Sequence, residues 1–324
     1  MLFSVVVPVY NGSKYLSEAI DSLLGQKYIG RDEFEIIVVN DGSNDEGETR
    51  VCARKYGENI RYFEKENGGV STALNLGIAH AKGEFICWLS HDDVFCEDKL
   101  ATQKEAINRL RSDGVDDFVL FSRQSFIGPD GAPVWQKRVN PNETGQIFVY
   151  SAEDAFSNLL VGTLSVGGCT IAIPRKLFGN KYAGLFVDDF RYIQDRAMWL
   201  KMALVGVVFA HQDRVLVHSR VHGGQQTGRF QDRLYRESRL FLEWVLANRK
   251  SFTVELSDVQ LSAMCFELGK YRMVSALRNN PSILRDFSSP FMLIKSLGRF
   301  SFGFALSYVL KVYRHYINFR YRKV

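Results

Sequence analysis

The first 112 residues alternate between continuous apolar runs and segments whose apolar side chains recur at helical spacing. Short apolar runs indicate buried strands, and apolar positions three and four apart indicate one face of a helix. The predicted strands are residues 2–9, 34–39, 60–64 and 84–89. The predicted helices are residues 14–25, 46–57, 70–82 and 97–112. Successive strand–helix units of this kind predict a parallel sheet covered by helices.

This regular alternation stops after residue 115. Residues 117–138 predict a β-hairpin around the turn Gly128-Pro129-Asp130-Gly131. Residues 140–170 contain many turn-forming positions and are predicted to be mostly loop. The other predicted elements are a helix at 194–204, short strands at 207–210 and 214–218, and three helical stretches within 230–316.

The composition is that of a folded globular protein. Of the 324 residues, 46% are apolar and 24% are charged, which excludes the disordered, collagen-like and coiled-coil classes. The five cysteines are scattered and include no C-x-x-C pair, so we expect neither a disulfide framework nor a zinc ribbon, and a reducing cytosol as the compartment. Residues 1–8 lack the features of a signal peptide and are expected to form a strand.

The net charge of +5 is unevenly distributed. Residues 271–324 contain ten Lys and Arg against one acidic residue, which gives the tail a charge of +9 and residues 1–270 a charge of −4. A protein that binds duplex nucleic acid needs basic side chains along one face of its folded domain. We therefore expect no nucleic-acid partner.

Ligands of open parallel sheets bind beyond the carboxyl ends of the strands. These ends are polar and rich in glycine, and their sequences are Val9-Tyr10-Asn11-Gly12, Asn40-Asp41-Gly42-Ser43, Lys65-Glu66-Asn67-Gly68-Gly69 and Ser90-His91-Asp92-Asp93. Asp41 has the chemistry to bind a ribose or base, and Gly68 precedes a helix whose first N–H groups favour an anion. Each segment alone also fits a plain helix cap or turn.

Three further positions offer site chemistry. The adjacent carboxylates Asp92 and Asp93 repel each other unless a divalent cation or another positive group lies beside them. Asp195 begins an amphipathic helix, and Arg220 and His222 follow a strand in a loop that contains glycine. The alternatives are that Asp93 and Asp195 cap helices, that Asp92 is solvated and that His222 lies on the surface.

In this order the segments resemble the inverting family 2 glycosyltransferases, which have the GT-A fold. The similarity extends over residues 2–225 and includes Val5–Asn11, Asn40–Ser43, Asn67–Gly77, Ser90–Asp93, Gln194–Leu200 and Arg220–His222. Two positions depart from the family pattern. Ser90 replaces the first acidic residue of the D-x-D motif, and Gln194 replaces the Glu that precedes the catalytic Asp.

The resemblance implies an α/β fold of GT-A type, with a mostly parallel central sheet, helices on both faces and a C-terminal helical extension. It places a nucleotide-sugar-dependent domain at residues 1–225 and a helical region at 226–324. It implies transfer of a sugar, with inversion, from a nucleoside-diphosphate donor such as a UDP-sugar to a hydroxyl group of a glycan, in cell-surface polysaccharide synthesis.

The resemblance also assigns individual roles. Asp195 is the expected general base, and Mn²⁺ or Mg²⁺ is expected at Asp92 and His222, with Asp93 as a weaker candidate. The residues expected to bind the donor are Pro8, Tyr10, Asn11, Asp41, Asn67, Gly68, Ser90, His91 and Arg220.

Two other functions are compatible with parts of the pattern. A nucleotidyltransferase needs a basic glycine-rich loop after the first strand, where this chain has only Lys14. A non-catalytic nucleotide-sugar-binding assembly subunit at the membrane is compatible with the substitutions at Ser90 and Gln194.

The basic tail is also rich in aromatic and aliphatic residues. Its longest uncharged run, residues 300–310, has eleven residues, whereas a spanning helix needs about 20. We therefore expect a helix in the headgroup layer on the cytoplasmic, inner face of the cell membrane, which favours a lipid-linked glycan acceptor. The alternative is a helical hairpin packed on the catalytic domain or on a second subunit in a homo-oligomer.

Overall fold

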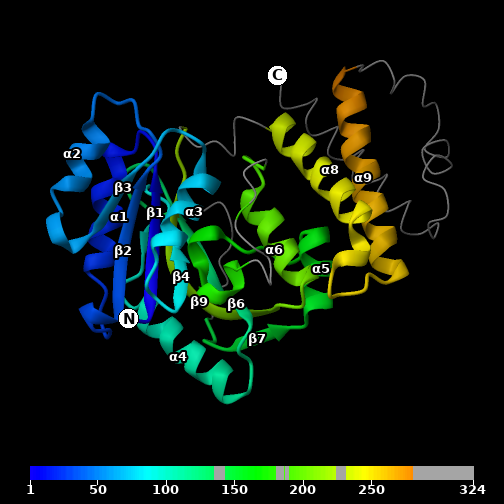
Figure 1. The fold of residues 1–324 in the computed structure, drawn as a ribbon, viewed down its shortest axis with the longest axis horizontal. Helices are drawn as coiled ribbons and strands as arrows, with labels where there is room; N and C mark the ends of the chain where they lie inside the picture. The colour runs from blue at the N-terminus through cyan, green and yellow to red at the C-terminus, as the bar shows by residue number, and fades with distance from the viewer. Residues whose placement is uncertain (135–142, 180–185, 187–189, 224–230, 280–324) are drawn as a thin grey trace. The chain divides into compact units, whose positions relative to one another are not determined.

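The computed structural model describes residues 1–134, 143–179, 186, 190–223 and 231–279 (Figure 1). The chain forms two compact units. The first contains Met1–Gln231 and Lys250–Glu255, and the second contains Asp232–Arg249 and the chain from Leu256 onward. The division expected between residues 225 and 226 stays a prediction.

The first unit is built around one mixed sheet, in the order β3-β2-β1-β4-β8-β6-β9-β5, with β7 also paired to β9. Its strands are β1 (Phe3–Val9), β2 (Phe34–Asn40), β3 (Arg61–Glu64), β4 (Phe85–Trp88), β5 (Val94–Phe95), β6 (Phe118–Ile127), β7 (Ile147–Tyr150), β8 (Ile171–Pro174) and β9 (Val208–Arg220). Its helices are α1 (Ser13–Leu24), α2 (Glu48–Arg54), α3 (Val70–His80), α4 (Lys99–Ser112), α5 (Ala152–Val161) and α6 (Gln194–Leu204).

Strands β1 to β4 form the parallel part of the sheet, as predicted. β1 lies between β2 and β4 and is parallel to both, and β3 is parallel to β2. The carboxyl ends of these strands therefore lie along one edge. In the other half, β8 is antiparallel to β4 and β6, while β6 and β9 run parallel. The predicted α/β fold class is confirmed, with a sheet that is mixed beyond β4.

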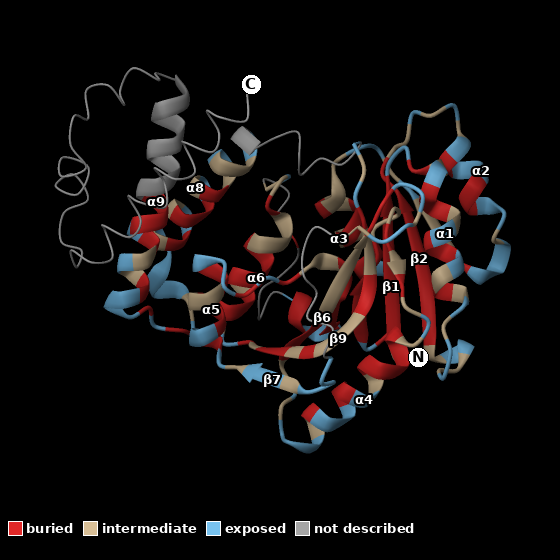
Figure 2. Cartoon of the chain, turned by 180° about the vertical axis from the view of Figure 1, so that it is seen from behind, coloured by how far each residue is buried: buried red, intermediate tan, exposed pale blue. Residues whose placement is uncertain are grey.

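Helices cover both faces of β1. Val5 and Val7 lie in an apolar core with Leu16 of α1, whereas Val6 points to the opposite face and meets α3. A Cβ atom added at Gly77 of α3 would lie 2.3 Å from Cγ1 of Val6, so this helix approaches the strand only because residue 77 is glycine. Figure 2 shows β1 and β2 buried along their lengths, as continuous apolar strands between two helix layers should be.

Two sequence predictions were wrong. Residues 140–170, predicted as loop, contain β7 and α5; the Ser151 hydroxyl caps α5 by accepting a hydrogen bond from the Asp154 N–H at 3.1 Å. The short strands predicted at 207–210 and 214–218 form one strand, β9, in which a register shift opposite Ser122 and Arg123 accommodates the polar residues 211–214. A bulge of this kind lets polar residues interrupt the apolar alternation without ending the strand.

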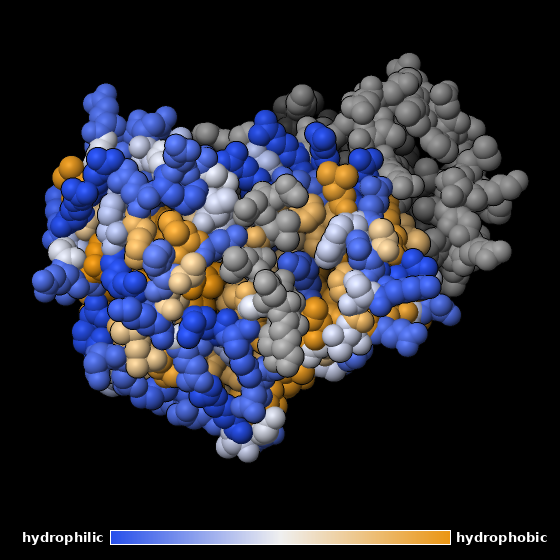
Figure 3. Space-filling view, viewed as in Figure 1, coloured by the Kyte–Doolittle hydropathy of each residue, from blue (hydrophilic) through white to orange (hydrophobic). Residues whose placement is uncertain are grey.

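The predicted hairpin is present where the structure describes it, because β6 ends in the turn Gly128–Gly131 and Ile127 then forms a bridge with Pro133. Its second arm beyond residue 134 lies outside the described residues. On the face of the first unit that Figure 3 shows, hydrophilic side chains separate several groups of apolar ones.

The second unit contains α9 (Asp258–Asn279) and all of α8 (Gln231–Ala247) except its first residue. Among the residues whose burial the structure describes, its buried apolar side chains are Phe241, Leu242, Val245, Leu256, Met264, Phe266 and Leu268. Of the three helical stretches predicted within 230–316, these two are described and the third lies outside the described residues. None of the described helices combines the length and the apolar character that crossing a membrane requires.

Candidate functional site

The loops after β1 and β2 are joined by hydrogen bonds. The Nδ2 group of Asn11 donates to Asn44 Oδ1 at 2.7 Å, and the Asn44 N–H donates to Asn11 Oδ1 at 2.9 Å. The Tyr10 hydroxyl also donates to Asn44 Oδ1, at 3.3 Å, and its side chain stays 40% exposed. These contacts place the predicted donor residues Tyr10 and Asn11 at the carboxyl edge of the sheet.

Asp41 joins the end of β2 to the glycine segment that precedes α3. Its carboxylate accepts hydrogen bonds from the N–H groups of Gly68 and Gly69 at 3.0 and 2.7 Å, and from Lys65 Nζ at 2.8 Å. Asn67 Nδ2 donates to the Asp41 carbonyl oxygen at 2.8 Å. The carboxylate is therefore committed to holding this segment, and Asp41 is only 3% exposed. The nucleoside contact expected of Asp41 stays a prediction.

Asp92 and His222 meet although 130 residues separate them. The Nε2 atom of His222 lies 3.0 Å from Asp92 Oδ2, because β9 runs back beside the short strand β5 that follows the 90–93 turn. His222 also packs against Tyr15 of α1, with ring centroids 5.2 Å apart. Two residues expected to hold a metal thus lie side by side.

Arg220 fixes the turn that carries Asp92. Its Nε donates to the Asp92 carbonyl oxygen at 2.9 Å, and Nη1 donates to the Gly128 carbonyl oxygen at 3.1 Å. Nη2 forms an ion pair with Glu18 of α1 at 2.6 Å, and the guanidinium lies 4.6 Å from the centre of the Tyr15 ring. All three guanidinium nitrogens contact the protein, and Arg220 is 2% exposed. The direct donor contact expected of Arg220 stays a prediction.

Asp93 points into the protein. Its Oδ1 accepts a hydrogen bond from the Arg220 N–H at 2.8 Å, and its carboxyl also bonds to the thiol of Cys169. Burial, with a smaller contribution from the charge of Asp92, raises the pKa of Asp93 to about 6. Asp92, which faces His222, is therefore the carboxylate better placed for a cation.

Ser90 and His91 are also held by protein groups. The Ser90 N–H donates to Cys169 Sγ at 3.2 Å, and that thiol lies 3.3 Å from Ser90 Oγ. His91 hydrogen-bonds to the Pro8 carbonyl oxygen, and burial lowers the pKa of its imidazole. A Cβ atom at Gly12 would lie 2.3 Å from His91 Cδ2, so this turn packs tightly against the end of β1.

Asp195 lies in the first turn of α6, where its Oδ1 accepts a hydrogen bond from the Arg196 N–H at 2.7 Å. An aromatic series places this helix beside the end of β4. The Phe186 ring lies 6.1 Å from the Trp88 ring of β4 and 6.3 Å from the Trp199 ring of α6. Because Asp195 is one helical turn before Trp199, both lie on the same face. Burial raises the pKa of Asp195.

Asp92 and His222 fit a divalent cation that takes its remaining ligands from a substrate. In the part of the chain that the structure describes, no group of three or more His, Cys, Asp or Glu side chains is arranged to hold a metal by itself. Mg²⁺ is commonly bound by one or two carboxylates together with phosphate oxygens. Oδ2 of Asp92 and Nε2 of His222, 3.0 Å apart, are oxygen and imidazole donors of the right kind.

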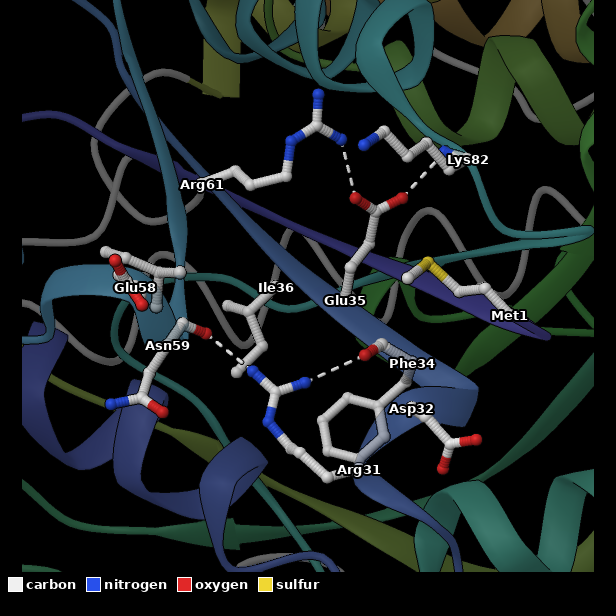
Figure 4. A pocket seen from close by; sticks show the side chains of 11 residues that line it. Met1, Arg31, Asp32, Phe34, Glu35, Ile36, Glu58, Asn59, Arg61 and Lys82 are labelled. Carbon is white, nitrogen blue, oxygen red and sulfur yellow. Dashed lines mark hydrogen bonds and ion pairs between the residues drawn. The ribbon is translucent and has the colours of Figure 1, made fainter.

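A pocket lies at the opposite, amino-terminal ends of the parallel strands (Figure 4). Its charged groups bond to one another and to the backbone. Glu35 accepts hydrogen bonds from Arg61 and from the Lys82 N–H, and Arg31 donates to the carbonyl oxygens of Phe34 and Asn59. The predicted donor and metal residues all lie outside its lining.

Sequence reasoning missed the residues that hold these groups in place. Glu18 and Tyr15 of α1 contact Arg220, Cys169 holds Ser90, and Lys65 holds Asp41. Lys65 belongs to the strand-end segment Lys65–Gly69, so the sequence offered it as a candidate site residue. Cys169 gave no such signal, because nothing in its local sequence shows that it meets residues 79 positions away.

Residues 4–155 match the family model for glycosyl transferase family 2. Two uncharacterized glycosyltransferases are similar to the chain. The one from Rickettsia felis is 37% identical over 224 residues, which are 69% of this chain and 35% of that protein. The one from Rickettsia typhi is 40% identical over 228 residues, which are 70% of this chain and 66% of that protein. The chain thus spans between about a third and two thirds of these relatives.

A third relative is the putative teichuronic acid biosynthesis glycosyltransferase TuaG of Bacillus subtilis, 28% identical over 225 residues, which are 68% of this chain and 79% of TuaG.

Solved structures show the same fold. The structure of TarS from S. aureus in complex with UDP-GlcNAc superposes on this chain with a TM-score of 0.61 at 22% sequence identity. The match covers 88% of this chain and 76% of the TarS chain. The mannosyltransferase PcManGT from Pyrobaculum calidifontis, in complex with GDP-Man and Mn²⁺, has a TM-score of 0.56 at 17% identity, with 91% and 83% covered. With the family match over residues 4–155 and the shared fold, the chain belongs to glycosyltransferase family 2 and has a GT-A fold.

Proposed function

We propose that the chain transfers a sugar from a nucleoside-diphosphate donor, a UDP-sugar, to a hydroxyl group of a lipid-linked glycan, with inversion, in cell-surface polysaccharide synthesis. The observation that carries this proposal is the contact of Asp92 with His222 at 3.0 Å, at the edge where the strand-end loops meet. The structure of TarS with UDP-GlcNAc supports the donor class, and the similarity to TuaG, a putative teichuronic acid biosynthesis glycosyltransferase, supports the cell-surface role.

In the proposed mechanism Asp195 accepts the proton of the acceptor hydroxyl while that oxygen attacks the anomeric carbon from the face opposite the diphosphate. A positioned base of this kind contributes roughly 10²–10⁴-fold in rate. Asp92 and His222 would hold Mn²⁺ or Mg²⁺, which when bound neutralises the charge that develops on the diphosphate. Arg220 keeps the 90–93 turn in place through the Asp92 carbonyl oxygen. The bond to the leaving oxygen breaks as the new glycosidic bond forms, which inverts the configuration.

The function is tested with a panel of nucleotide sugars. A matched donor at 100-fold its Kd should stabilise the folded chain by about 2.7 kcal/mol, which thermal unfolding detects. Release of the nucleoside diphosphate on addition of a lipid-linked acceptor and Mn²⁺ then identifies an enzyme. Stabilisation without release would instead favour a non-catalytic assembly subunit. A panel without any stabilising donor would contradict the proposal.

We also propose that residues 271–324 bind the inner face of the membrane. Only the first nine of these residues are described, and the proposal rests on the charge of +9 and the aromatic content of the whole segment. Each Lys or Arg near an anionic leaflet contributes about 1 kcal/mol. Deletion after residue 285 should therefore leave donor hydrolysis intact but abolish co-sedimentation with anionic liposomes.

Neutral liposomes are the control for this deletion, since the full chain should bind them far less than anionic ones. Co-sedimentation of the shortened chain, or failure of the full chain to co-sediment with anionic liposomes, would contradict a membrane-binding tail. Packing of the tail on the catalytic domain or on a second subunit would then be favoured.

A further inference from the structure

Arg191 lies against the glycine segment that Asp41 holds. Its Nη2 donates a hydrogen bond to Asn67 Oδ1 at 2.9 Å. A Cβ atom added at Gly69, where φ is +91°, would lie 2.8 Å from Arg191 Nε and 3.5 Å from Cζ. The guanidinium therefore lies directly against the backbone of this segment, in a position that only a glycine at residue 69 leaves open.

The charge of Arg191 is not neutralised by the described residues. The nearby carboxylate of Asp41 is bound by Lys65 and by two backbone N–H groups. In the described ranges Arg191 forms no ion pair, and its hydrogen bond to Asn67 uses one of five N–H donors. Arg191 is exposed, whereas the buried Arg220 is paired with Glu18.

Arg191 connects the segment that precedes Asp195 with the glycine segment held by Asp41. It stands four residues before Asp195, in the segment that leads into α6. Through Asn67, whose Nδ2 donates to the Asp41 carbonyl oxygen at 2.8 Å, it connects that segment to the end of β2. A second contact docks the same segment, because Asn75 of α3 and Phe186 exchange hydrogen bonds of 2.9 and 3.0 Å.

We propose that Arg191 binds the diphosphate of the nucleotide-sugar donor at the rim formed by Gly68 and Gly69. This inference rests on the proposed function, because it assigns a ligand to the same site. A planar guanidinium with free donors suits phosphate oxygens, which it can bind through two parallel N–H groups. Gly69 places no side chain beside the guanidinium. The Lys65 ammonium is already bound to Asp41, Glu66 and Thr72, so Arg191 is the nearby cation that keeps donors for a phosphate. A donor bound to Arg191 would also fix the segment that precedes the base.

The test measures binding of UDP and of UDP-GlcNAc to the full chain by calorimetry. Arg191→Gln should raise the Kd of both by at least about 10-fold, because a hydrogen bond to a charged group is worth roughly 1.5–3 kcal/mol. Arg191→Lys keeps the positive charge but lacks the planar pair of N–H donors, so it should raise the Kd less than Arg191→Gln does. Arg109→Gln removes another exposed arginine, on α4, and should leave both Kd values unchanged.

Salt separates direct binding from a purely structural role. An exposed contact between a cation and a phosphate weakens as ionic strength rises. The Kd for UDP should therefore depend less on salt in Arg191→Gln than in the unmodified chain. If Arg191 only supported Asn67, the substitution would weaken binding without changing this salt dependence, and that result would overturn the inference.

Two failures can be told apart. If the unmodified chain binds a nucleotide sugar and Arg191→Gln binds it with a Kd within twofold, the role of Arg191 is refuted while the proposed function stands. If the unmodified chain binds no nucleotide sugar of the panel, the proposed function is refuted and the inference with it.

Discussion

Asp195→Asn is expected to lower kcat at least about 100-fold while the Kd of the donor changes by no more than a few-fold. The first expectation follows from the loss of a general base, which costs roughly 10²–10⁴-fold. The second follows from geometry. In the described part of the chain the Asp195 carboxylate accepts hydrogen bonds only from backbone N–H groups, including that of Arg196, and from none of the predicted donor residues. Steady-state kinetics with acceptor, together with calorimetry with donor alone, measure both quantities.

The matched control is Asp113→Asn, which removes an exposed carboxylate at the C-terminal end of α4 and should leave kcat unchanged. Thermal unfolding of Asp195→Asn verifies that the variant is folded. A kcat above a tenth of the unmodified value would reject Asp195 as the base. A large rise in donor Kd without loss of kcat would instead make Asp195 a donor ligand.

The same assignment predicts a pH dependence. Burial raises the pKa of Asp195 above the ordinary aspartate value, and only the deprotonated carboxylate can accept the hydroxyl proton. The rate should therefore rise with pH as Asp195 loses its proton and level off above its raised pKa. This acidic limb should appear in kcat at saturating donor and acceptor, and its absence would contradict a titrating base at this position.

The parallel half of the fold could be predicted because its signals are local. The runs at residues 2–9 and 34–39 are apolar almost without interruption, as strands buried on both faces are, and they appear as β1 and β2. β9 could not be delimited, because His211 to Arg214 have the composition of a turn. Tertiary contacts keep them in the strand: His211 and Gln212 pair with both β6 and β7, and the Asp213 N–H donates to the Gln146 carbonyl oxygen. α5 was missed although the cap Ser151 and the helical spacing of Phe156, Leu159 and Leu160 were present in the sequence.

The candidate site was predictable only in part. Its motif residues lie at strand ends, so topology alone brings Tyr10, Asp41 and Asp92 to one edge of the sheet. The partners of each group depend on tertiary packing. Nothing near Arg220 in sequence indicates that Glu18 would bind its guanidinium. Asp92 and Asp93 are adjacent in sequence, yet the Asp92 carboxylate contacts His222 whereas the Asp93 carboxylate accepts the Arg220 N–H.

Activity is expected to require a divalent metal at Asp92 and His222. Chelator should stop transfer, and Mn²⁺ or Mg²⁺ should restore it, because the leaving diphosphate gains charge that Asp92 and His222 alone cannot neutralise. Full activity in excess chelator would exclude this role and leave Arg191, beside the glycine segment, to stabilise the diphosphate.

Asp92→Asn tests the position of that metal. The substitution keeps the shape of the side chain but removes the negative charge that faces His222 at 3.0 Å. Loss of a residue that merely supports a metal ligand lowers metal affinity about 10–100-fold. We expect Asp92→Asn to lower the affinity for Mn²⁺ by at least as much. Electron paramagnetic resonance with UDP present measures this affinity. Asp93→Asn provides the contrast, since Asp93 is buried and accepts the Arg220 N–H at 2.8 Å. It should lower the stability of the folded chain and change the Mn²⁺ affinity less. If Asp93→Asn weakens Mn²⁺ binding more than Asp92→Asn does, the metal lies on the other carboxylate.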